Sequence, residues 1–333
     1  MKKVNNGTVL LIAVLAIAFL IPLAVHKPYY LHVLTICLFW AYMAASWNIV
    51  GGFVGQLSLG HGIYTAIGAY GTVILFNNFH ISPWIGMILA GIVATGIAVL
   101  IGLPTFKLRG AYFALSTVAL SAGLVVLIEN TEKIGNILIG GAEGLSVNMA
   151  GSSFLNFQFM SKVPYYYIAL VMLILVVLFS RQLMRSKLGY YMVAVREDED
   201  AARALGINVR TIKLKSIALS AFATALGGAF YAMLIRYLLP TAIAGAEMSN
   251  QMVFLTIVGG SGSVLGPVVG GISLSLISEV VRFFLGDKIM GLHLLIYGLV
   301  VVLIIMYRPR GIIEVLEKWY TRWFKRTPEQ EEV

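Results

Sequence analysis

The chain carries its densest charge in Arg196–Val209, which reads REDEDAARALGINV. Four consecutive acids run directly into Ala201–Leu205, a set of good helix formers. Acids are favoured at a helix N-terminus because the helix dipole is positive there, and a glycine such as Gly206 can end a helix with a positive φ. The sequence therefore predicts a short helix of about two turns over Asp200–Gly206.

This predicted helix has two interpretations. It can be an ordinary capped helix on the surface, or it can dock in a groove of another protein. Docking would use the small alanine face and the terminal glycine, with the flanking charges setting the register. The residues that would serve docking are Asp200, Ala201, Ala202, Arg203 and Gly206. The residues alone leave both interpretations open.

A second polar stretch, GGFVGQLSLGHG at Gly51–Gly62, interrupts apolar sequence long enough to cross a membrane. At membrane depth, Gln56, Ser58 and His61 would each need a partner, because unsatisfied polar groups are costly there. They can bond neighbouring helices as packing residues, with His61 a satisfied interior histidine. They can also line a solute path, since a broken helix aims backbone amides or carbonyls at a ligand.

No residue pattern indicates catalysis. The glycine-rich GGSGSVLG at Gly259–Gly266 lacks the Lys-Ser or Lys-Thr of a phosphate-binding loop, so its plain interpretation is close helix packing at a broken span. The five histidines are scattered without metal-ligand spacing, and the single Cys37 excludes an intrachain disulfide framework. We therefore expect no enzymatic activity, no cofactor and no metal.

The elements that position these residues must be membrane helices. Hydrophobic residues make up 59% of the 333 and charged residues only 12%, whereas a soluble domain carries about 25% charge. Long apolar runs indicate helices rather than the alternating pattern of a β-barrel. The expected fold is an all-α polytopic membrane protein with about ten transmembrane or partial helices. The apolar runs lie at 9–25, 31–50, 52–76, 84–103, 111–128, 165–180, 216–235, 244–260, 264–285 and 290–307.

Three of these runs predict interrupted or partial spans, which are tolerated where protein or a cavity surrounds them. The runs 52–76 and 244–260 are rich in Gly, Ser and Thr, and 264–285 begins with a Gly-Pro pair. We expect the acids Glu247 and Glu279 to lie near the outer side. Arg282, three residues after Glu279, is expected to pair with it.

The basic residues divide unevenly between the two sides of the membrane. Six of the 24 Lys and Arg fall on one side, which leaves eighteen on the side of the termini, Lys107–Arg109 and 181–215. Because Lys and Arg accumulate in cytoplasmic loops, we expect both termini, the loop 181–215 and the tail 308–333 to be cytoplasmic. The loop 129–164 is then external, and its Gly and Ser content predicts irregular structure. Despite a net charge of +9, the basic residues form no single stripe, so no nucleic acid is expected.

At this point the sequence shows a resemblance. DAARALG at Asp200–Gly206 is similar to the EAA…G motif of ABC importer permeases, with Asp200 in place of the usual Glu. Six co-linear segments between about residues 40 and 312 resemble the branched-chain amino acid permeases of the M type. They are SWNIVGGFVGQLSLGHGIYTAIGAY (Ser46–Tyr70), LRGAYFALSTVAL (Leu108–Leu120), GGAEGL (Gly140–Leu145), REDEDAARALGINVRTIKLKSIALSAFATALGGAFYA (Arg196–Ala232), VGGSGSVLGPVVGG (Val258–Gly271) and YRPRGI (Tyr307–Ile312).

The resemblance implies that residues 1–333 form one permease domain of an importer for branched-chain amino acids, in the cytoplasmic membrane of a bacterium or archaeon. It implies that 181–215 is a coupling loop seated in a cleft of a cytoplasmic ATPase. The expected partners are two ATPase subunits, a second related permease, an external solute-binding protein that touches 129–164, and membrane lipid.

Other functions stay open at this stage. Permeases for urea and short amides share these motifs, so the solute is an expectation rather than a derivation. An ion-coupled secondary transporter would place acids at mid-membrane, where the sequence indicates few. A membrane enzyme would need a cluster of nucleophile, base and metal ligands, and the sequence contains no such cluster.

Overall fold

The computed structural model describes residues 16–25, 27–285, 292–308, 311–315 and 318. The predicted first span, 9–25, and the predicted tail, 308–333, lie largely outside the described residues. The longer helices are α2 (Pro28–Gly51), α3 (His61–Phe79), α4 (Pro83–Thr105), α5 (Ala111–Glu129), α6 (Val163–Met184), α9 (Val209–Ile235), α12 (Gly266–Leu285) and α13 (Leu292–Tyr307). The shorter ones are α7 (Lys187–Glu197), α8 (Glu199–Ala204), α10 (Pro240–Ala244) and α11 (Ala246–Gly259).

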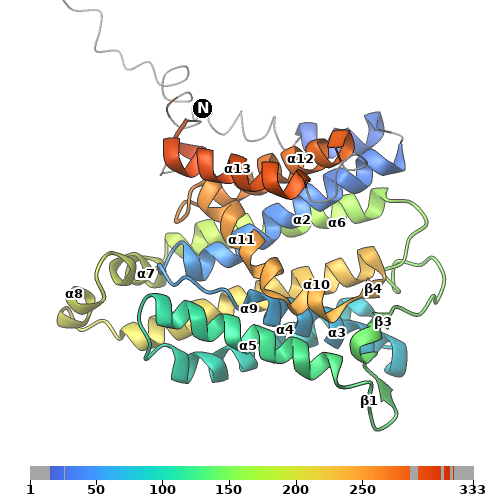
Figure 1. The fold of residues 1–333 in the computed structure, drawn as a ribbon, viewed down its shortest axis with the longest axis horizontal. Helices are drawn as coiled ribbons and strands as arrows, with labels where there is room; N and C mark the ends of the chain where they lie inside the picture. The colour runs from blue at the N-terminus through green and yellow to red at the C-terminus, as the bar shows by residue number, and fades with distance from the viewer. Residues whose placement is uncertain (1–15, 26, 286–291, 309–310, 316–317, 319–333) are drawn as a thin grey trace, which may run out of the picture.

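The long helices lie side by side along the long axis of the molecule (Figure 1). Six helices in the described part are long and apolar enough to cross a membrane, namely α2, α4, α5, α6, α9 and α12. This supports the polytopic all-α membrane class. The predicted number of about ten and the predicted orientation of the termini are not decided by these helices and stay predictions.

Helices α2, α3 and α9 form the centre of the bundle because small residues let them approach closely. A Cβ atom added to Gly68 of α3 would lie 1.9 Å from the carbonyl oxygen of Ala225 in α9. One added to Gly228 of α9 would lie 2.1 Å from the carbonyl oxygen of Thr65 in α3. Any larger side chain at either glycine would force the two backbones apart, so this crossing depends on glycine.

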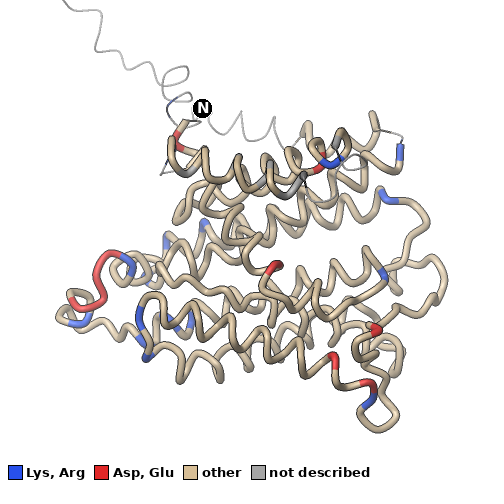
Figure 2. The backbone as a smooth tube through the Cα atoms, in the orientation of Figure 1, with Lys and Arg blue, Asp and Glu red and all other residues tan. Residues whose placement is uncertain are grey.

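The segments 181–215 and 129–164 lie at opposite ends of the bundle (Figure 1). Helices α7 and α8 mark the first end, here called the α8 end. The second, here called the β end, carries β1 (Lys133–Ile134), β2 (Ile137–Leu138), the 3-10 turn η1 (Gly141–Glu143), β3 (Leu145–Ser146) and β4 (Tyr237–Leu238). Figure 2 shows the acids of α8 and a group of Lys and Arg gathered at the α8 end.

Both of these segments are more regular than the sequence indicated. In 129–164, where irregular structure was expected, β1 pairs with β2 and β3 pairs with β4 of residues 237–238, both antiparallel. In 181–215, the sequence predicted one short helix but the structure contains α7 as well. Ser186 caps α7 by accepting a hydrogen bond from the amide of Gly189 at 3.3 Å.

Candidate functional site

Helix α8 confirms the short helix predicted over Asp200–Gly206, and it begins one residue earlier, at Glu199. Asp198 starts it, because its carboxylate accepts hydrogen bonds from the amides of Asp200 at 2.8 Å and Ala201 at 2.9 Å. Gly206 follows the helix with φ 82°, the left-handed conformation expected of it. Nothing lies within 4 Å of a Cβ placed on Gly206, so its requirement for glycine is conformational rather than steric.

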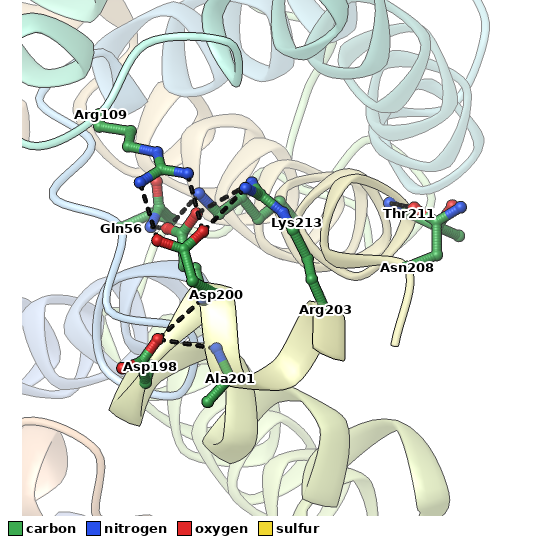
Figure 3. Close-up of polar contacts among 10 residues, drawn as sticks. Gln56, Arg109, Asp198, Asp200, Ala201, Arg203, Asn208, Thr211 and Lys213 are labelled. Atoms are coloured by element: carbon green, nitrogen blue, oxygen red, sulfur yellow. Dashed lines mark hydrogen bonds and ion pairs between the residues drawn. The ribbon is translucent and has the colours of Figure 1, made fainter. Parts of the chain in front are cut away.

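The Asp200 carboxylate ties α8 to the connection between α4 and α5 (Figure 3). Arg109 donates to its two oxygens at 3.0 and 3.2 Å, and Arg203 donates to one of them at 3.0 Å. The Arg109 guanidinium holds the pKa of the Asp200 carboxyl below its usual value, with a smaller contribution from Arg203. All three side chains are exposed, so solvent screens these contacts and they position α8 more than they stabilise it. The contact also confirms that Arg109 and 181–215 share one end of the molecule.

The Glu199 carboxylate makes the more buried connection. Its Oε1 accepts hydrogen bonds from the Lys213 ammonium of α9 and, at 3.3 Å, from the Gln56 side-chain amide (Figure 3). The Lys213 side chain is only 2% exposed, and that of Glu199 is 21% exposed. Glu199 therefore joins α8, α9 and the segment after α2. The pair of Glu199 and Lys213 was not predictable from the sequence, because no local signal links residues on two separate helices.

Of the neighbouring residues Ala201 and Ala202 in α8, one is exposed and the other is buried, which corrects one expectation. Ala202 is 2% exposed and packs among Phe53, Val54 and Val195 of the same chain, so it is not free to enter a cleft of a partner. Ala201 is exposed, and Leu205 is 81% exposed. The face of α8 that another protein can reach is therefore formed by Ala201, Arg203 and Leu205.

The polar stretch Gly51–Gly62 is not a continuous span. Residues 53–60 form no helix, and α3 begins only at His61. The sequence had predicted an apolar run that starts at residue 52. The backbone turns at Gly55 with φ 75°, and Arg196 donates to the Gly52 carbonyl at 3.3 Å. The segment thus starts beside α7 and α8 and then runs back into the bundle.

His61 lies at the middle of the bundle and is fully buried. Its Nδ1 lies 3.1 Å from Ser58 Oγ, and its Nε2 lies 2.8 Å from Ser220 Oγ. Ser220 is the twelfth of the 27 residues of α9, so its partner His61 lies near the middle of that helix. These partners are what the packing interpretation expects of Ser58 and His61, while Gln56 lies beside Glu199. A role of the three residues in a solute path stays a prediction.

A second interruption lies at the same depth. The Ala244 carbonyl at the end of α10 accepts from Ser121, the eleventh of the 19 residues of α5, at 2.6 Å. The amide of Gly62, in the first turn of α3, donates to Ser249 of α11 at 2.8 Å. Helix α11 has 14 residues, about 21 Å at 1.5 Å per residue, whereas the hydrocarbon core is about 30 Å thick. The predicted interruption in 244–260 is confirmed, and we call the meeting point of α3, α5, α10 and α11 the mid-span junction.

Glu247 belongs to the mid-span junction, so the expectation that it lies near the outer side is wrong. It is exposed, stands two residues before Ser249 in the first turn of α11, and has no hydrogen bond or ion pair within the described part of the chain. Placing a carboxylate against lipid at the bilayer centre costs about 2.5–3.5 kcal/mol on insertion scales. The dipole at a helix N-terminus stabilises a negative charge by only about 0.3–1 kcal/mol. Helix stabilisation alone does not account for an acid here.

For the other acid, Glu279, the predicted pair with Arg282 is confirmed, while its position near the outer side stays a prediction. It pairs with Arg282 in α12, with 3.7 Å between the carboxylate and the guanidinium. Glu279 also lines an apolar cavity of about 300 Å³ between α2 and α12, walled by Tyr29, Tyr30 and Phe283 among others. Glu279 therefore already has a charged partner, unlike Glu247 within the described part of the chain.

Residues 29–307 match the family described as "Branched-chain amino acid transport system / permease component". The "High-affinity branched-chain amino acid transport system permease protein LivM" of Escherichia coli K12 is 28% identical over 326 residues, covering 91% of this chain and 74% of the relative.

Two relatives come from the archaeon Methanocaldococcus jannaschii. The "Probable branched-chain amino acid transport permease protein LivM" is 24% identical and covers 79% of this chain and 81% of the relative. The "Probable branched-chain amino acid transport permease protein LivH" is 25% identical and covers 74% and 77%. No solved structure matches the chain.

Proposed function

The chain belongs to the permease family of branched-chain amino acid transport systems, and from this premise we propose that it is the membrane subunit of an ABC importer for branched-chain amino acids. The observation that carries the proposal is α8. This helix stands at one end of the bundle and is tied by Asp200 and Glu199 to three other segments. A force applied to α8 is therefore delivered to the membrane helices.

In this proposal α8 is the coupling helix, and the α8 end is cytoplasmic. Ala201, Arg203 and Leu205 contact the cleft of an ATPase subunit, while Asp200 and Gly206 fix the helix in register. Ala202 anchors α8 to the permease itself. In this proposal ATP hydrolysis belongs to two separate subunits. The glycine-rich stretch Gly259–Gly266 of this chain has no lysine for a phosphate-binding loop.

The β end faces outward and receives a solute-binding protein. Large apolar side chains stand exposed on 129–164, with Met149 80%, Phe154 64% and Met160 95% exposed. Trp84 Nε1 donates to the Phe154 carbonyl at 2.8 Å, so this apolar surface is held on the membrane helices. An exposed apolar cluster on an anchored loop is more typical of a surface that binds another protein than of a surface that stays in water.

The partner permease is a relative of this chain. The LivM and LivH proteins of one archaeon both resemble it, which supports an importer built from two related permeases. Helix α5 is largely exposed in the single chain, and a second permease together with membrane lipid covers such a face. The assembly lies in the cytoplasmic membrane of a bacterium or archaeon.

Reconstitution tests the function. The permease, its partner permease, the ATPases and the binding protein are placed in liposomes, and uptake of labelled leucine is measured with and without ATP. We expect uptake that needs ATP and the binding protein, that isoleucine and valine compete for, and that survives a protonophore. Uptake driven by a proton or Na⁺ gradient without ATP would indicate a secondary transporter, and competition by urea alone would indicate the amide permeases.

A further inference from the structure

The mid-span junction contains one charge and several polar groups that already have partners. The Gly62 amide donates to Ser249, and the Ala244 carbonyl accepts from Ser121. Both ring nitrogens of His61 are occupied. Glu247, in contrast, has no partner in the described part of the chain and is exposed. The junction therefore holds a free carboxylate at a depth where lipid cannot solvate it.

The surface beside Glu247 leaves room for a ligand. Its neighbours in sequence, Gly245 and Ala246, have almost no side chain, and both are partly exposed. Across the Ser121–Ala244 contact, α5 exposes Ala122 and Gly123, and a Cβ on Gly123 would meet nothing within 4 Å. These small side chains leave the Glu247 carboxylate open on this side of the described structure.

We propose that Glu247 is the counter-charge that receives the α-ammonium of the amino acid at the middle of its path. This rests on the proposed function. A branched-chain amino acid is a zwitterion, and its ammonium loses hydration at mid-membrane unless an acid replaces the lost water. Urea carries no charge and needs no such acid. Glu247 thus favours an ammonium-bearing solute over the short amides that the motifs alone left open.

The first test compares Glu247→Gln with Glu247→Asp in the reconstituted importer. Glutamine keeps the size and removes the charge, so leucine uptake should fall at least tenfold while assembly with the ATPases is unchanged. Aspartate keeps the charge and should retain a measurable part of the uptake. Glu279→Gln is the matched control, because it removes an acid that already has Arg282 as partner, and it should stay within twofold of wild type.

The outcomes separate two failures. If the wild-type importer moves no amino acid with ATP, the proposed function is wrong. If the wild type transports and Glu247→Gln transports at the same rate, the role of Glu247 is wrong while the function stands. Loss of uptake together with loss of assembled complex would assign Glu247 to packing and would also overturn the inference.

A second test asks whether the site is wet and needs a negative charge. Glu247→Cys is made on a Cys37→Ala background, since Cys37 is the chain's one cysteine. Charged, membrane-impermeant thiosulfonate reagents should react with the new thiol in the assembled importer. A sulfonate-bearing reagent should restore uptake and a trimethylammonium reagent should not. A thiol that never reacts faces lipid, and equal effects of both reagents exclude a counter-charge. If this variant does not assemble, the glutamine comparison decides.

Discussion

The Glu199 carboxylate shows how much one residue can determine at the α8 end. It neutralises Lys213, whose ammonium is almost fully buried, and it holds Gln56 at the same time. The Asp200 contacts with Arg109 and Arg203 look more numerous but lie in solvent. Burial therefore ranks Glu199 above Asp200 for stability, although Asp200 is the residue that the motif points to.

Replacing Glu199 by alanine should lower the free energy of unfolding by about 2–3 kcal/mol, because Lys213 is left buried without a counter-charge. The double variant Glu199→Ala with Lys213→Met should recover much of the loss. Arg203→Ala, which removes only exposed contacts, should cost less than about 1 kcal/mol. Thermal unfolding in detergent measures all three. Equal losses for Glu199→Ala and Arg203→Ala would contradict this ranking.

The effect of a substitution at Gly206 should depend only on how readily the new residue adopts a positive φ. Its φ of 82° is strained for residues with a Cβ, by about 1–2 kcal/mol, while no neighbour clashes with one. Gly206→Val should redirect the chain after α8 and reduce co-purification of the ATPase, with membrane insertion unchanged. Gly206→Asn should be milder, since asparagine adopts the left-handed region more readily. Valine and asparagine variants that both co-purify at wild-type level would refute the conformational role.

At the scale of elements, α8 presents two different faces within one and a half turns. Ala202 belongs to the permease core, and Ala201 belongs to the outside. A helix this short holds its position only because the inner face and the ion pairs fix it. The same helix can then transmit force through its outer face.

Tryptophan at these two positions should separate the faces. Ala202→Trp overfills the cluster around Phe53 and should lower thermal stability by about 1–3 kcal/mol or more in the permease alone. Ala201→Trp should leave the isolated permease as stable as wild type. It should reduce ATPase co-purification, or uncouple ATP hydrolysis from uptake. An Ala201→Trp importer with normal coupling would show that this face does not contact the ATPase.

The same scale shows what the sequence could and could not predict. Helix α8 was predictable because its cap, its acids and Gly206 are all local signals. The interruption of 244–260 was predictable from its Gly, Ser and Thr content, but the depth of Glu247 was not. That depth becomes visible through Ser121, which reaches the Ala244 carbonyl from a helix 123 residues earlier. Lys213 was missed for the same reason, since its acid lies on another helix.

At the scale of the whole molecule, the two proposed contact surfaces lie at opposite ends of the bundle (Figure 1). The α8 end carries the acids of α8 beside a group of Lys and Arg (Figure 2), and the β end exposes Met149, Phe154 and Met160. The two ends therefore suit two different partners. Each surface can be altered without touching the other.

Crosslinking should identify the partner of the β end. A photoreactive residue at Met160 or Phe154, both highly exposed, should crosslink to the purified solute-binding protein in the assembled importer. The same probe at Leu205 should crosslink to the ATPase instead. Met160→Asp should weaken binding-protein-stimulated ATP hydrolysis by placing a charge in an apolar contact. Crosslinks to the binding protein from another outer position, with none from 129–164, would show that the docking surface lies elsewhere.

Residues 55–60 have no helical hydrogen-bond ladder, and they join the α8 end directly to His61 at the start of α3. Hydrogen bonds from Trp47 Nε1 to the Ser58 carbonyl at 2.7 Å and from the Leu59 amide to Thr117 Oγ1 at 3.0 Å hold this segment against α2 and α5. In the function proposed above, a displacement of α8 would therefore reach the interior by two parallel connections. One is the extended segment, joined to α8 through Gln56, and the other is the continuous helix α9, joined to it through Lys213.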